Sequence, residues 1–302
     1  MKKDFLSILD ISREELANLI AHARKLKEER RVGIHTPVLA NKTLGMIFEK
    51  SSTRTRISFE TGMFELGGHA LFLNPKDMQL GRGEAICDTA RVMTRFVSAI
   101  MIRANRHDEV QELAVHADIP VINGLSDKEH PCQILADIMT IEERLFRTDG
   151  IKVAWIGDGN NVCTSLILST ILTGMEVIVG SPKEFAPKED LVKESLEKGA
   201  KVRVVTDPFE AARDADVVMT DTWISMGQED EIDRRREIFM PYQVNKDLLS
   251  VAKPGAIVMH CLPAHRNWEI TDEVIDSKES AVWDQAENRL HVQKALLVRL
   301  LA

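Results

Sequence analysis

Residues 51–56 (SSTRTR) place four hydroxyl groups and two guanidinium groups in one short stretch. An apolar run typical of a buried strand precedes it at 43–48, and an apolar stripe at helical spacing follows at 59–66. The stretch therefore lies at a strand-to-helix turn. At such a helix start, free backbone N–H groups and the helix dipole favour an anion.

Four residues of this turn are candidates for holding a phosphate group. Ser52, Thr53 and Thr55 offer hydroxyl donors. Arg54 offers a planar fork suited to two phosphate oxygens. The alternative is an ordinary helix cap with solvated arginines, because hydroxyl residues are common at helix starts.

Three further polar residues would join the same edge of the first domain. Arg103 ends a predicted strand at 99–102, although an arginine in a structural ion pair is the alternative. His130 and Gln133 open a predicted helix at 131–146 and could face one ligand, or His130 could only cap that helix. Metal binding by His130 is disfavoured, since no partner ligands lie at the usual spacing.

Two more candidates lie outside these elements. Gln79 is near the tip of the polar, glycine-rich loop 74–84, which is either functional or simply mobile surface. Arg289 lies at the start of the predicted terminal helix 285–301. It could reach the ligand or pair with a neighbouring acid.

A glycine-containing turn, residues 157–161 (GDGNN), opens the second half of the chain. It resembles a dinucleotide fingerprint, but Val162 replaces the third glycine and Asp158 would lie close to a pyrophosphate, so the case for NAD is weak. Asn161 offers both a donor and an acceptor, which suits a zwitterion. Its alternative role is the N-cap of the next helix.

Two later loops carry the remaining candidates. Asp221 follows a predicted strand and could hold an ammonium group, while Ser225 and Met226 could offer backbone N–H groups to a carboxylate. A plain loop with a capping aspartate is the alternative. The loop 260–266 (HCLPAHR) also follows a strand. Its histidines and cysteine suggest zinc, but adjacent residues on one loop make poor tetrahedral geometry.

The elements that must position these residues alternate between strands and helices, which predicts two α/β domains, each with a mostly parallel sheet flanked by helices. Ligands in such sheets bind at the carboxyl ends of the strands, so we expect the active site in the interdomain cleft. The predicted domains are 1–147, 148–284 and a C-terminal helix, 285–302, that packs back on the first. Predicted strands are 43–48, 70–73, 99–102, 121–122, 151–156, 176–179, 201–205, 216–220, 256–259 and 281–283.

Composition excludes several classes of function. The chain has 302 residues, 28% of them charged, and a net charge of −8 with interspersed signs, so no basic surface is expected to bind nucleic acid or an anionic membrane. No apolar run is long enough for a membrane span, and no signal peptide is expected. The four cysteines are scattered, as in a reduced, cytoplasmic protein.

Four strings in this order and spacing resemble the aspartate/ornithine carbamoyltransferase superfamily over essentially the whole chain. They are STRTR at 52–56, HPCQ at 130–133, DTWISMG at 221–227 and HCLPAHR at 260–266. The last two favour the ornithine branch, because the aspartate branch lacks SMG and carries proline where Cys261 stands. The resemblance implies carbamoyl transfer from carbamoyl phosphate to L-ornithine in arginine biosynthesis, without metal or cofactor.

The resemblance also implies residue roles and an assembly. Carbamoyl phosphate would be held by Ser52, Thr53, Arg54, Thr55, Arg103, His130, Gln133, Arg289 and, from a neighbouring subunit of a homotrimer, Gln79. Ornithine would be held by Asn161, Asp221, Ser225 and Met226, with Cys261 and Leu262 lining the reacting centre. Arg103, His130 and Thr55 are candidate donors to the developing oxyanion, and Cys261 and Asp221 would orient the amine or help remove its proton.

Four other functions are weighed against this one. Transfer to putrescine would leave the Ser225–Met226 amides without a carboxylate, and transfer to aspartate would set a second carboxylate against Asp221. An NAD-dependent oxidoreductase would rest on the 157–159 turn alone. A non-catalytic phosphometabolite sensor would bind without turnover.

Overall fold

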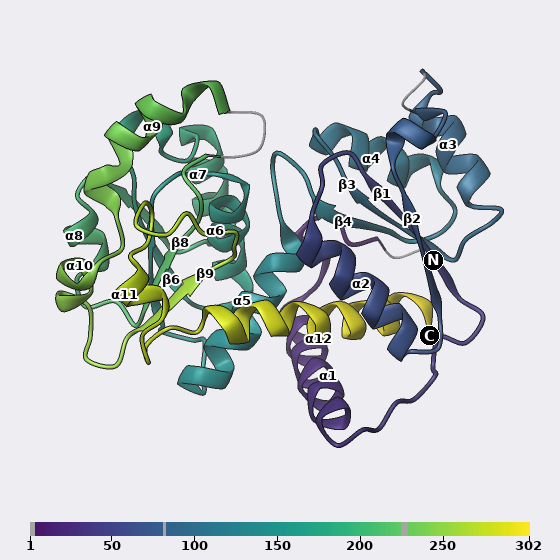
Figure 1. Ribbon diagram of the computed structural model, residues 1–302, viewed down its shortest axis with the longest axis horizontal. Coiled ribbons are helices and arrows are strands. Elements are labelled where there is room, and N and C mark those ends of the chain that lie inside the picture. Colours follow the sequence, from purple (N-terminus) through teal and green to yellow (C-terminus); the bar gives the residue numbers. More distant parts are fainter. Residues whose placement is uncertain (1–3, 81–82, 225–228) are drawn as a thin grey trace. The chain divides into compact units, whose positions relative to one another are not determined.

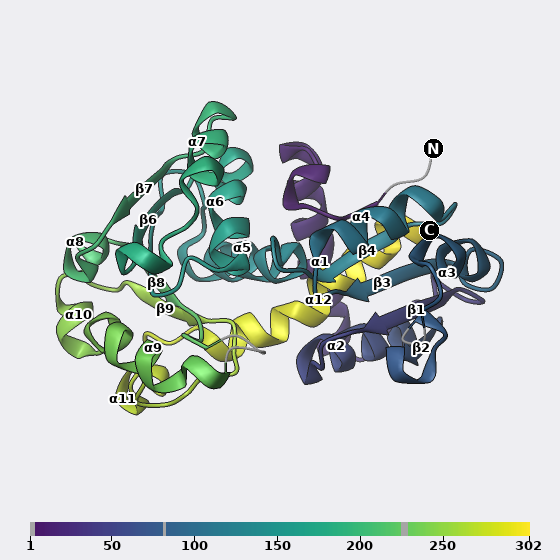
Figure 2. The ribbon, with the colours of Figure 1, turned by 90° about the horizontal axis from the view of Figure 1, so that it is seen from above.

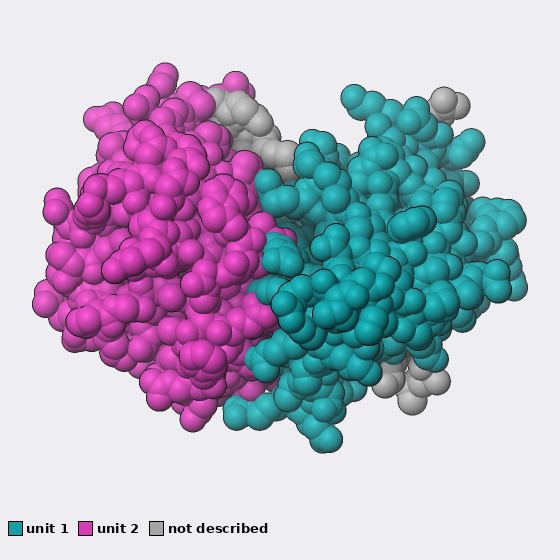
Figure 3. Space-filling view, turned by 60° about the horizontal axis from the view of Figure 1, so that its bottom comes forward, with its two compact units in different colours: residues 1–136, 287–302 teal, residues 137–286 magenta. Residues whose placement is uncertain are grey.

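The computed structural model describes residues 4–80, 83–224 and 229–302, and its contacts divide the chain into two compact units (Figures 1 and 3). Unit 1 comprises Met1–Ala136 and Glu287–Ala302, and unit 2 comprises Asp137–Ala286. Unit 1 is therefore built from two stretches that are far apart in the sequence. Among the described residues, no helix is long and apolar enough to span a bilayer.

Unit 1 contains a four-stranded parallel sheet in the order β2-β1-β3-β4. Its strands are β1 (Thr43–Phe48), β2 (His69–Leu73), β3 (Ala99–Arg103) and β4 (Val121–Leu125). Its helical elements are η1 (Ile8–Asp10), α1 (Arg13–Arg31), α2 (Thr53–Glu65), η2 (Pro75–Asp77), α3 (Ile86–Met93), α4 (His107–His116), the start of α5 (Pro131–Leu145) and most of α12 (Val282–Leu301). The connections between the strands put α2 on one face of the sheet and α3 with α4 on the other, as Figure 1 shows.

The predicted β-α alternation is confirmed in unit 1, with one informative difference in β4. The predicted strand covers 121–122 only. In the structure the strand continues to Leu125, and the register steps from Ile102↔Asn123 to Arg103↔Leu125. Gly124 is the extra residue, and a Cβ there would lie 2.4 Å from Sδ of Met101. Gly124 thus forms a bulge in β4, opposite the end of β3 that carries Arg103.

Unit 2 contains a five-stranded parallel sheet in the order β7-β6-β5-β8-β9. Its strands are β5 (Lys152–Ile156), β6 (Glu176–Gly180), β7 (Val202–Val205), β8 (Val217–Thr220) and β9 (Ile257–His260). Its helical elements after α5 are α6 (Asn161–Thr173), η4 (Lys183–Phe185), α7 (Glu189–Glu197), α8 (Pro208–Ala212), η5 (Glu229–Glu231), α9 (Ile232–Phe239), η6 (Met240–Tyr242), α10 (Lys246–Ser250), α11 (Asp272–Ile275) and the start of α12. Figure 2 shows α6 and α7 on the opposite side of the strands from α8 and α10.

The predicted strand at 281–283 is wrong. Only a single bridge, Val258↔Ser280, pairs this segment with β9, and the Ala281 N–H donates to the Val258 carbonyl at 2.8 Å. The chain then turns directly into α12 at Val282. A three-residue apolar run has no readable period, and here it forms the entry and first turn of a helix instead of a strand.

Two glycines that follow helices both have a positive φ, but only one of them lacks room for a Cβ atom. Gly33 follows α1 with φ +77° and has open space where a Cβ would be, whereas Gly67 follows α2 with φ +80° and a Cβ would lie 2.5 Å from Cβ of Pro37 and 3.0 Å from its Cα. We expect Gly33→Ala to cost about 1 kcal/mol of unfolding free energy, from strain alone. Gly67→Ala should cost about 2–4 kcal/mol, because overpacking adds to the strain. If denaturant unfolding gave the same loss of unfolding free energy for both variants, overpacking against Pro37 would not contribute at Gly67.

Candidate functional site

The turn before α2 has the predicted form of a capped helix start. Ser52 is the N-cap, with an extended backbone, and its hydroxyl accepts from the Thr55 N–H at 3.3 Å. Thr53, Arg54 and Thr55 are the first three residues of α2. Thr55 is buried, at 1% exposure, and Arg54 is half-buried. The first-turn N–H groups thus lie beside a hydroxyl and a guanidinium, an arrangement suited to a small anion.

Arg289 connects this turn to two other segments of unit 1. Its guanidinium donates through Nη2 to Oγ1 of Thr55 at 3.1 Å and through Nη1 to Oε1 of Gln133 at 2.7 Å. Arg289 is 3% exposed and Gln133 2%. Residues separated by more than 150 positions therefore lie in one hydrogen-bonded group. Arg289 is therefore buried within unit 1 and held by side chains from α2 and α5.

Gln293, which the sequence did not single out, completes the support of that guanidinium. With its amide oxygen turned toward Arg289, it accepts from Nε at 3.2 Å and Nη2 at 2.9 Å, while its amide nitrogen donates to the Ser58 hydroxyl. This orientation satisfies both ends of a fully buried amide. Its position one helical turn beyond Arg289 is the signal that could have identified it.

His130 lies where three positive charges converge. It is 5% exposed, directly before α5. Burial lowers the pKa of its imidazole well below the usual value, and the charges of Arg289, Arg103 and Arg54 lower this pKa further. Arg103 is the last residue of β3 and is 8% exposed. The imidazole is therefore neutral at physiological pH, in a buried environment that is strongly positive.

This buried imidazole predicts an acid dependence of stability. Because the folded-state pKa of His130 lies below the unfolded value of about 6.5, only the unfolded chain gains this proton as the pH falls below 6.5, so stability is lost there. We expect His130→Gln to reduce the slope of unfolding free energy against pH between 5 and 6.5 by up to about 1.4 kcal/mol per pH unit. The exposed His35→Gln variant is the control, and an unchanged slope in His130→Gln would contradict the burial.

Gln79 is not part of this group in the single chain. It is exposed on the loop that follows η2, where its carbonyl accepts from the Glu84 N–H at 3.1 Å. The predicted reach of this side chain into a neighbouring subunit's site remains a prediction.

In unit 2, Asp221 receives two side-chain hydrogen bonds directly after β8. Its Oδ1 accepts from Sγ of Cys261 at 2.8 Å, and its Oδ2 accepts from Nδ2 of Asn160 at 2.8 Å. Asp221 is 7% exposed, and Cys261 is partly buried. A buried carboxylate whose two oxygens both accept hydrogen bonds is suited to an ammonium ligand.

The N-cap of α6 is Asn160, so the alternative role of Asn161 as the cap is wrong. The Asn160 side chain accepts from the N–H groups of Val162 and Cys163 while it donates to Asp221. Asn161 is the first residue of α6 and is half-buried. Two consecutive asparagines cannot be told apart as caps from sequence. Ser225 and Met226 lie outside the described residues.

The loop after β9 is fixed by a histidine with both ring nitrogens engaged. Nδ1 of His260 accepts from the Leu262 N–H at 2.9 Å, which places the ring proton on Nε2, 3.2 Å from Oε1 of Glu269. Asp221, His260 and Cys261 have donor atoms within 4.8 Å of one another. To bind a metal, His260 would nevertheless have to give up one of these hydrogen bonds. The three residues therefore fit a loop held in place by hydrogen bonds better than a zinc site.

The glycine pair that suggests a dinucleotide has a packing explanation. Gly157 has φ +130°, and a Cβ at Gly159 would lie 2.3 Å from the backbone nitrogen of Pro187. Asp158 is partly buried, with 13% of its side chain exposed, and its carboxylate accepts from Nη1 of Arg235 at 3.1 Å. The two glycines therefore allow backbone segments of unit 2 to pack closely, and Asp158 binds Arg235 within the same unit.

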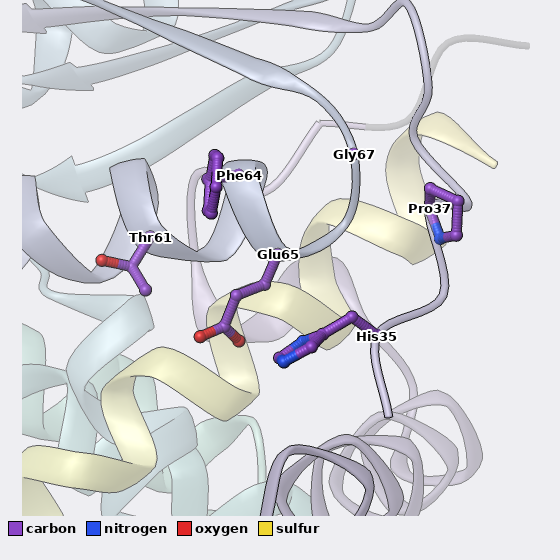
Figure 4. Close-up of a pocket in the computed structure, with 6 residues that line it drawn as sticks. All are labelled: His35, Pro37, Thr61, Phe64, Glu65 and Gly67. Carbon is purple, nitrogen blue, oxygen red and sulfur yellow. The ribbon is translucent and has the colours of Figure 1, made fainter. Parts of the chain in front are cut away.

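A hollow of about 500 Å³ lies elsewhere on unit 1, at the other end of α2 (Figure 4). Its lining includes His35, Phe64 and Glu65. Because α2 has 13 residues, this end is roughly 20 Å from the Ser52 cap. Glu65 is already paired with Arg30 at 2.7 Å and Lys294 at 2.8 Å, so the hollow is not part of the anion-binding group.

Comparisons with known proteins match both halves of the chain. The model of the aspartate/ornithine carbamoyltransferase carbamoyl-P binding domain matches residues 3–143, and that of the Asp/Orn binding domain matches 149–300. The ornithine carbamoyltransferase of Methanospirillum hungatei is 89% identical over 302 residues, covering 100% of both proteins. That of Methanoculleus marisnigri is 60% identical, covering 100% of this chain and 98% of the relative. The solved ornithine carbamoyltransferase of Pyrococcus furiosus has a TM-score of 0.95 at 51% identity, covering 99% of this chain and 97% of that one.

Proposed function

The chain belongs to the aspartate/ornithine carbamoyltransferase family, and from this we propose that it transfers the carbamoyl group of carbamoyl phosphate to the side-chain amine of L-ornithine. The products are L-citrulline and phosphate. The observation that carries the proposal lies in unit 1, where the buried Arg289 donates to Thr55 and Gln133 and the charges of Arg289, Arg103 and Arg54 all lower the pKa of the buried His130. Such a group matches a phosphorylated substrate with a polar carbonyl.

We assign carbamoyl phosphate to the residues of unit 1. The α2 N-terminus with Ser52, Thr53 and Arg54 would bind the phosphate oxygens. Thr55, Arg103 and His130 would donate to the carbonyl oxygen as it becomes an oxyanion. Gln133 and Arg289 would complete the site. These residues belong to the predicted domains 1–147 and 285–302.

We assign ornithine to unit 2, with Asn161, Asp221, Ser225 and Met226 as its ligands. Cys261 and Leu262 would line the reacting centre. The hydrogen bond from Cys261 to Asp221 supports a shared role in orienting the amine or removing its proton. A lysine-like amine with a pKa of about 10.4 must lose that proton before it attacks.

The reaction then proceeds without a covalent enzyme intermediate. The amine nitrogen forms a bond to the carbamoyl carbon, and a tetrahedral intermediate places negative charge on the former carbonyl oxygen. The carbonyl then re-forms as the bond from this carbon to the phosphate oxygen breaks, and phosphate leaves with the electron pair. The attacking nitrogen loses its extra proton, which the leaving phosphate takes up. Because the substrate is already an activated anhydride, positioning and charge stabilisation are sufficient contributions from the protein.

The decisive experiment offers carbamoyl phosphate with ornithine, putrescine and aspartate side by side. We expect citrulline from ornithine and little turnover with the other amines. Preference for putrescine would support the diamine alternative. Putrescine has no carboxylate, so the Asp221 carboxylate alone would be sufficient to bind it. Failure with all three would overturn the proposal.

We further propose that the enzyme is a cytoplasmic homotrimer, or an assembly of trimers, in which Gln79 acts on a neighbouring site. The exposed position of Gln79 and the scattered cysteines support this. Sedimentation in solution tests the assembly, and a monomer active at assay concentrations would contradict it.

A further inference from the structure

Arg235 in α9 is a buried arginine that joins four segments of unit 2. It is 6% exposed. Its Nη1 donates to the Trp223 carbonyl at 2.9 Å and to Oδ2 of Asp158 at 3.1 Å, and its Nε donates to Oε2 of Glu231 at 2.9 Å. Its guanidinium carbon also lies 4.5 Å from the centre of the Phe185 ring. A planar fork of this kind holds several acceptors in one fixed arrangement.

Two of these partners lie at the ends of neighbouring strands. Asp158 follows β5 by two residues, and Trp223 follows Asp221 by two residues at the end of β8. The two strands pair directly, in a register that reaches Ile156↔Thr220. Arg235 thus ties the backbone beyond Asp221 to the turn beyond β5. The Asn160 side chain, from the same turn, bonds to the Asp221 carboxylate.

The charges explain why an arginine is needed there. Burial raises the pKa of Asp158 to about 6, the positive charge of Arg235 opposes that rise, and the negative charge of Asp221 adds to it. The other titratable groups near the pair are Cys163 in α6 and the half-exposed Glu231 of η5. Without the guanidinium, two carboxyl groups would remain together in a largely dry environment, and the pKa of Asp158 would rise further.

We propose that Arg235, anchored by Asp158, is a positioning residue for ornithine: it fixes the Trp223 carbonyl and thereby the Asp221 carboxylate in its binding position. This rests on the assignment of ornithine to Asp221 in the proposed function. Arg235 acts through the backbone and need not touch either substrate. Its loss should therefore affect ornithine and leave carbamoyl phosphate binding unchanged.

The neighbouring Arg234 provides a matched control in the same helix. Its Nη2 pairs with Oε2 of Glu184 at 2.6 Å, but both side chains are about half exposed, at 59% and 47%. Exposed pairs of this kind contribute little. Arg234→Gln thus removes the same charge and the same chain length from α9 without touching the buried contacts.

The test compares Arg235→Gln, Arg235→Lys and Arg234→Gln in steady-state assays with each substrate varied in turn. We expect Arg235→Gln to raise the KM for ornithine about tenfold or more and to leave that for carbamoyl phosphate within about twofold. Arg235→Lys should be intermediate, because an ammonium keeps the charge but not the fork. Arg234→Gln should match the wild type. Equal rises in both KM values, or a normal KM for ornithine in Arg235→Gln, would overturn the inference.

Asp158→Asn provides a second test if Arg235→Gln does not fold. In the wild type, kcat/KM for ornithine should fall more steeply below about pH 6, where Asp158 protonates, than protonation of the ornithine amine alone requires. The kcat/KM for carbamoyl phosphate should not share this extra fall. Asp158→Asn should remove the extra fall and raise the KM for ornithine several-fold, and persistence of the extra fall in Asp158→Asn would overturn the role of the pair.

Wild-type turnover is measured first, and its absence would refute the proposed function by itself. Calorimetric titration of ornithine, in the presence of inorganic phosphate, then tests Arg235 without turnover. Weaker binding by Arg235→Gln than by Arg234→Gln supports the positioning role. Equal binding by the two variants, or no ornithine binding by the wild type, refutes it.

Discussion

Replacing Arg54 by alanine is expected to reduce kcat/KM for carbamoyl phosphate by about 10²–10³-fold. The guanidinium lies at the second position of α2, and its charge acts on the buried His130. Its removal would take away a charge-assisted donor from the substrate phosphate and from the phosphate that leaves. Loss of one preorganised donor to developing charge typically costs about 3–4 kcal/mol, which is the size of this effect. Steady-state kinetics with carbamoyl phosphate varied would measure it.

Arg56, two residues further along α2, is the matched control. It is exposed, pairs with Glu60 at 2.9 Å, and lies 3.9 Å from the centre of the Phe72 ring. Arg56→Ala removes the same charge from the same turn, yet kcat/KM should stay within about twofold because the pair is solvated. If both variants lost activity equally, the general field of the helix start would matter more than the position of Arg54.

Asp221→Asn is expected to reduce kcat/KM for ornithine by about 10²–10³-fold. The substitution preserves size and can still accept from Asn160, but it removes the charge that would pair with an ammonium and that accepts from the Cys261 thiol. Breaking a buried pair by neutralising one partner typically costs about 2–5 kcal/mol. Assays with ornithine varied at saturating carbamoyl phosphate would measure this loss.

The KM for carbamoyl phosphate serves as the internal control for Asp221→Asn, and it should change less than about threefold. Asp233→Asn, at an exposed position in the first turn of α9, tests whether loss of any acid from this region has the same effect. A parallel loss for both substrates would assign Asp221 to the fold and not to ornithine.

Much of the arrangement in unit 1 could be predicted because strand ends and helix starts are local signals. The turn at 51–56 reads as a cap from residue types alone, and Ser52 does cap α2. The placement of Arg103 follows from the parallel sheet, since carboxyl ends of adjacent strands meet at one edge. The contact of Arg289 with Thr55 joins residues 234 positions apart, and only the family resemblance indicated it.

The features that sequence reasoning missed depend on tertiary neighbours. Gly124 has the composition of a turn, but its role as a bulge depends on Met101 in the adjacent strand. Asn160 and Asn161 are chemically identical, and only the path of the chain decides which one caps α6 and reaches Asp221. Gln293 is one polar residue in a helix, and its role becomes visible only from its hydrogen bonds to the Arg289 guanidinium.

The construction of unit 1 from two distant stretches has a consequence for biosynthesis. The four strands of this unit leave the ribosome before unit 2, and Glu287–Ala302 follow only after unit 2. The nascent chain therefore cannot assemble Arg289 with Thr55 and Gln133 until the whole of unit 2 has been synthesised. A product truncated within unit 2 would lack this guanidinium, so carbamoyl phosphate could not protect it against proteolysis through these contacts.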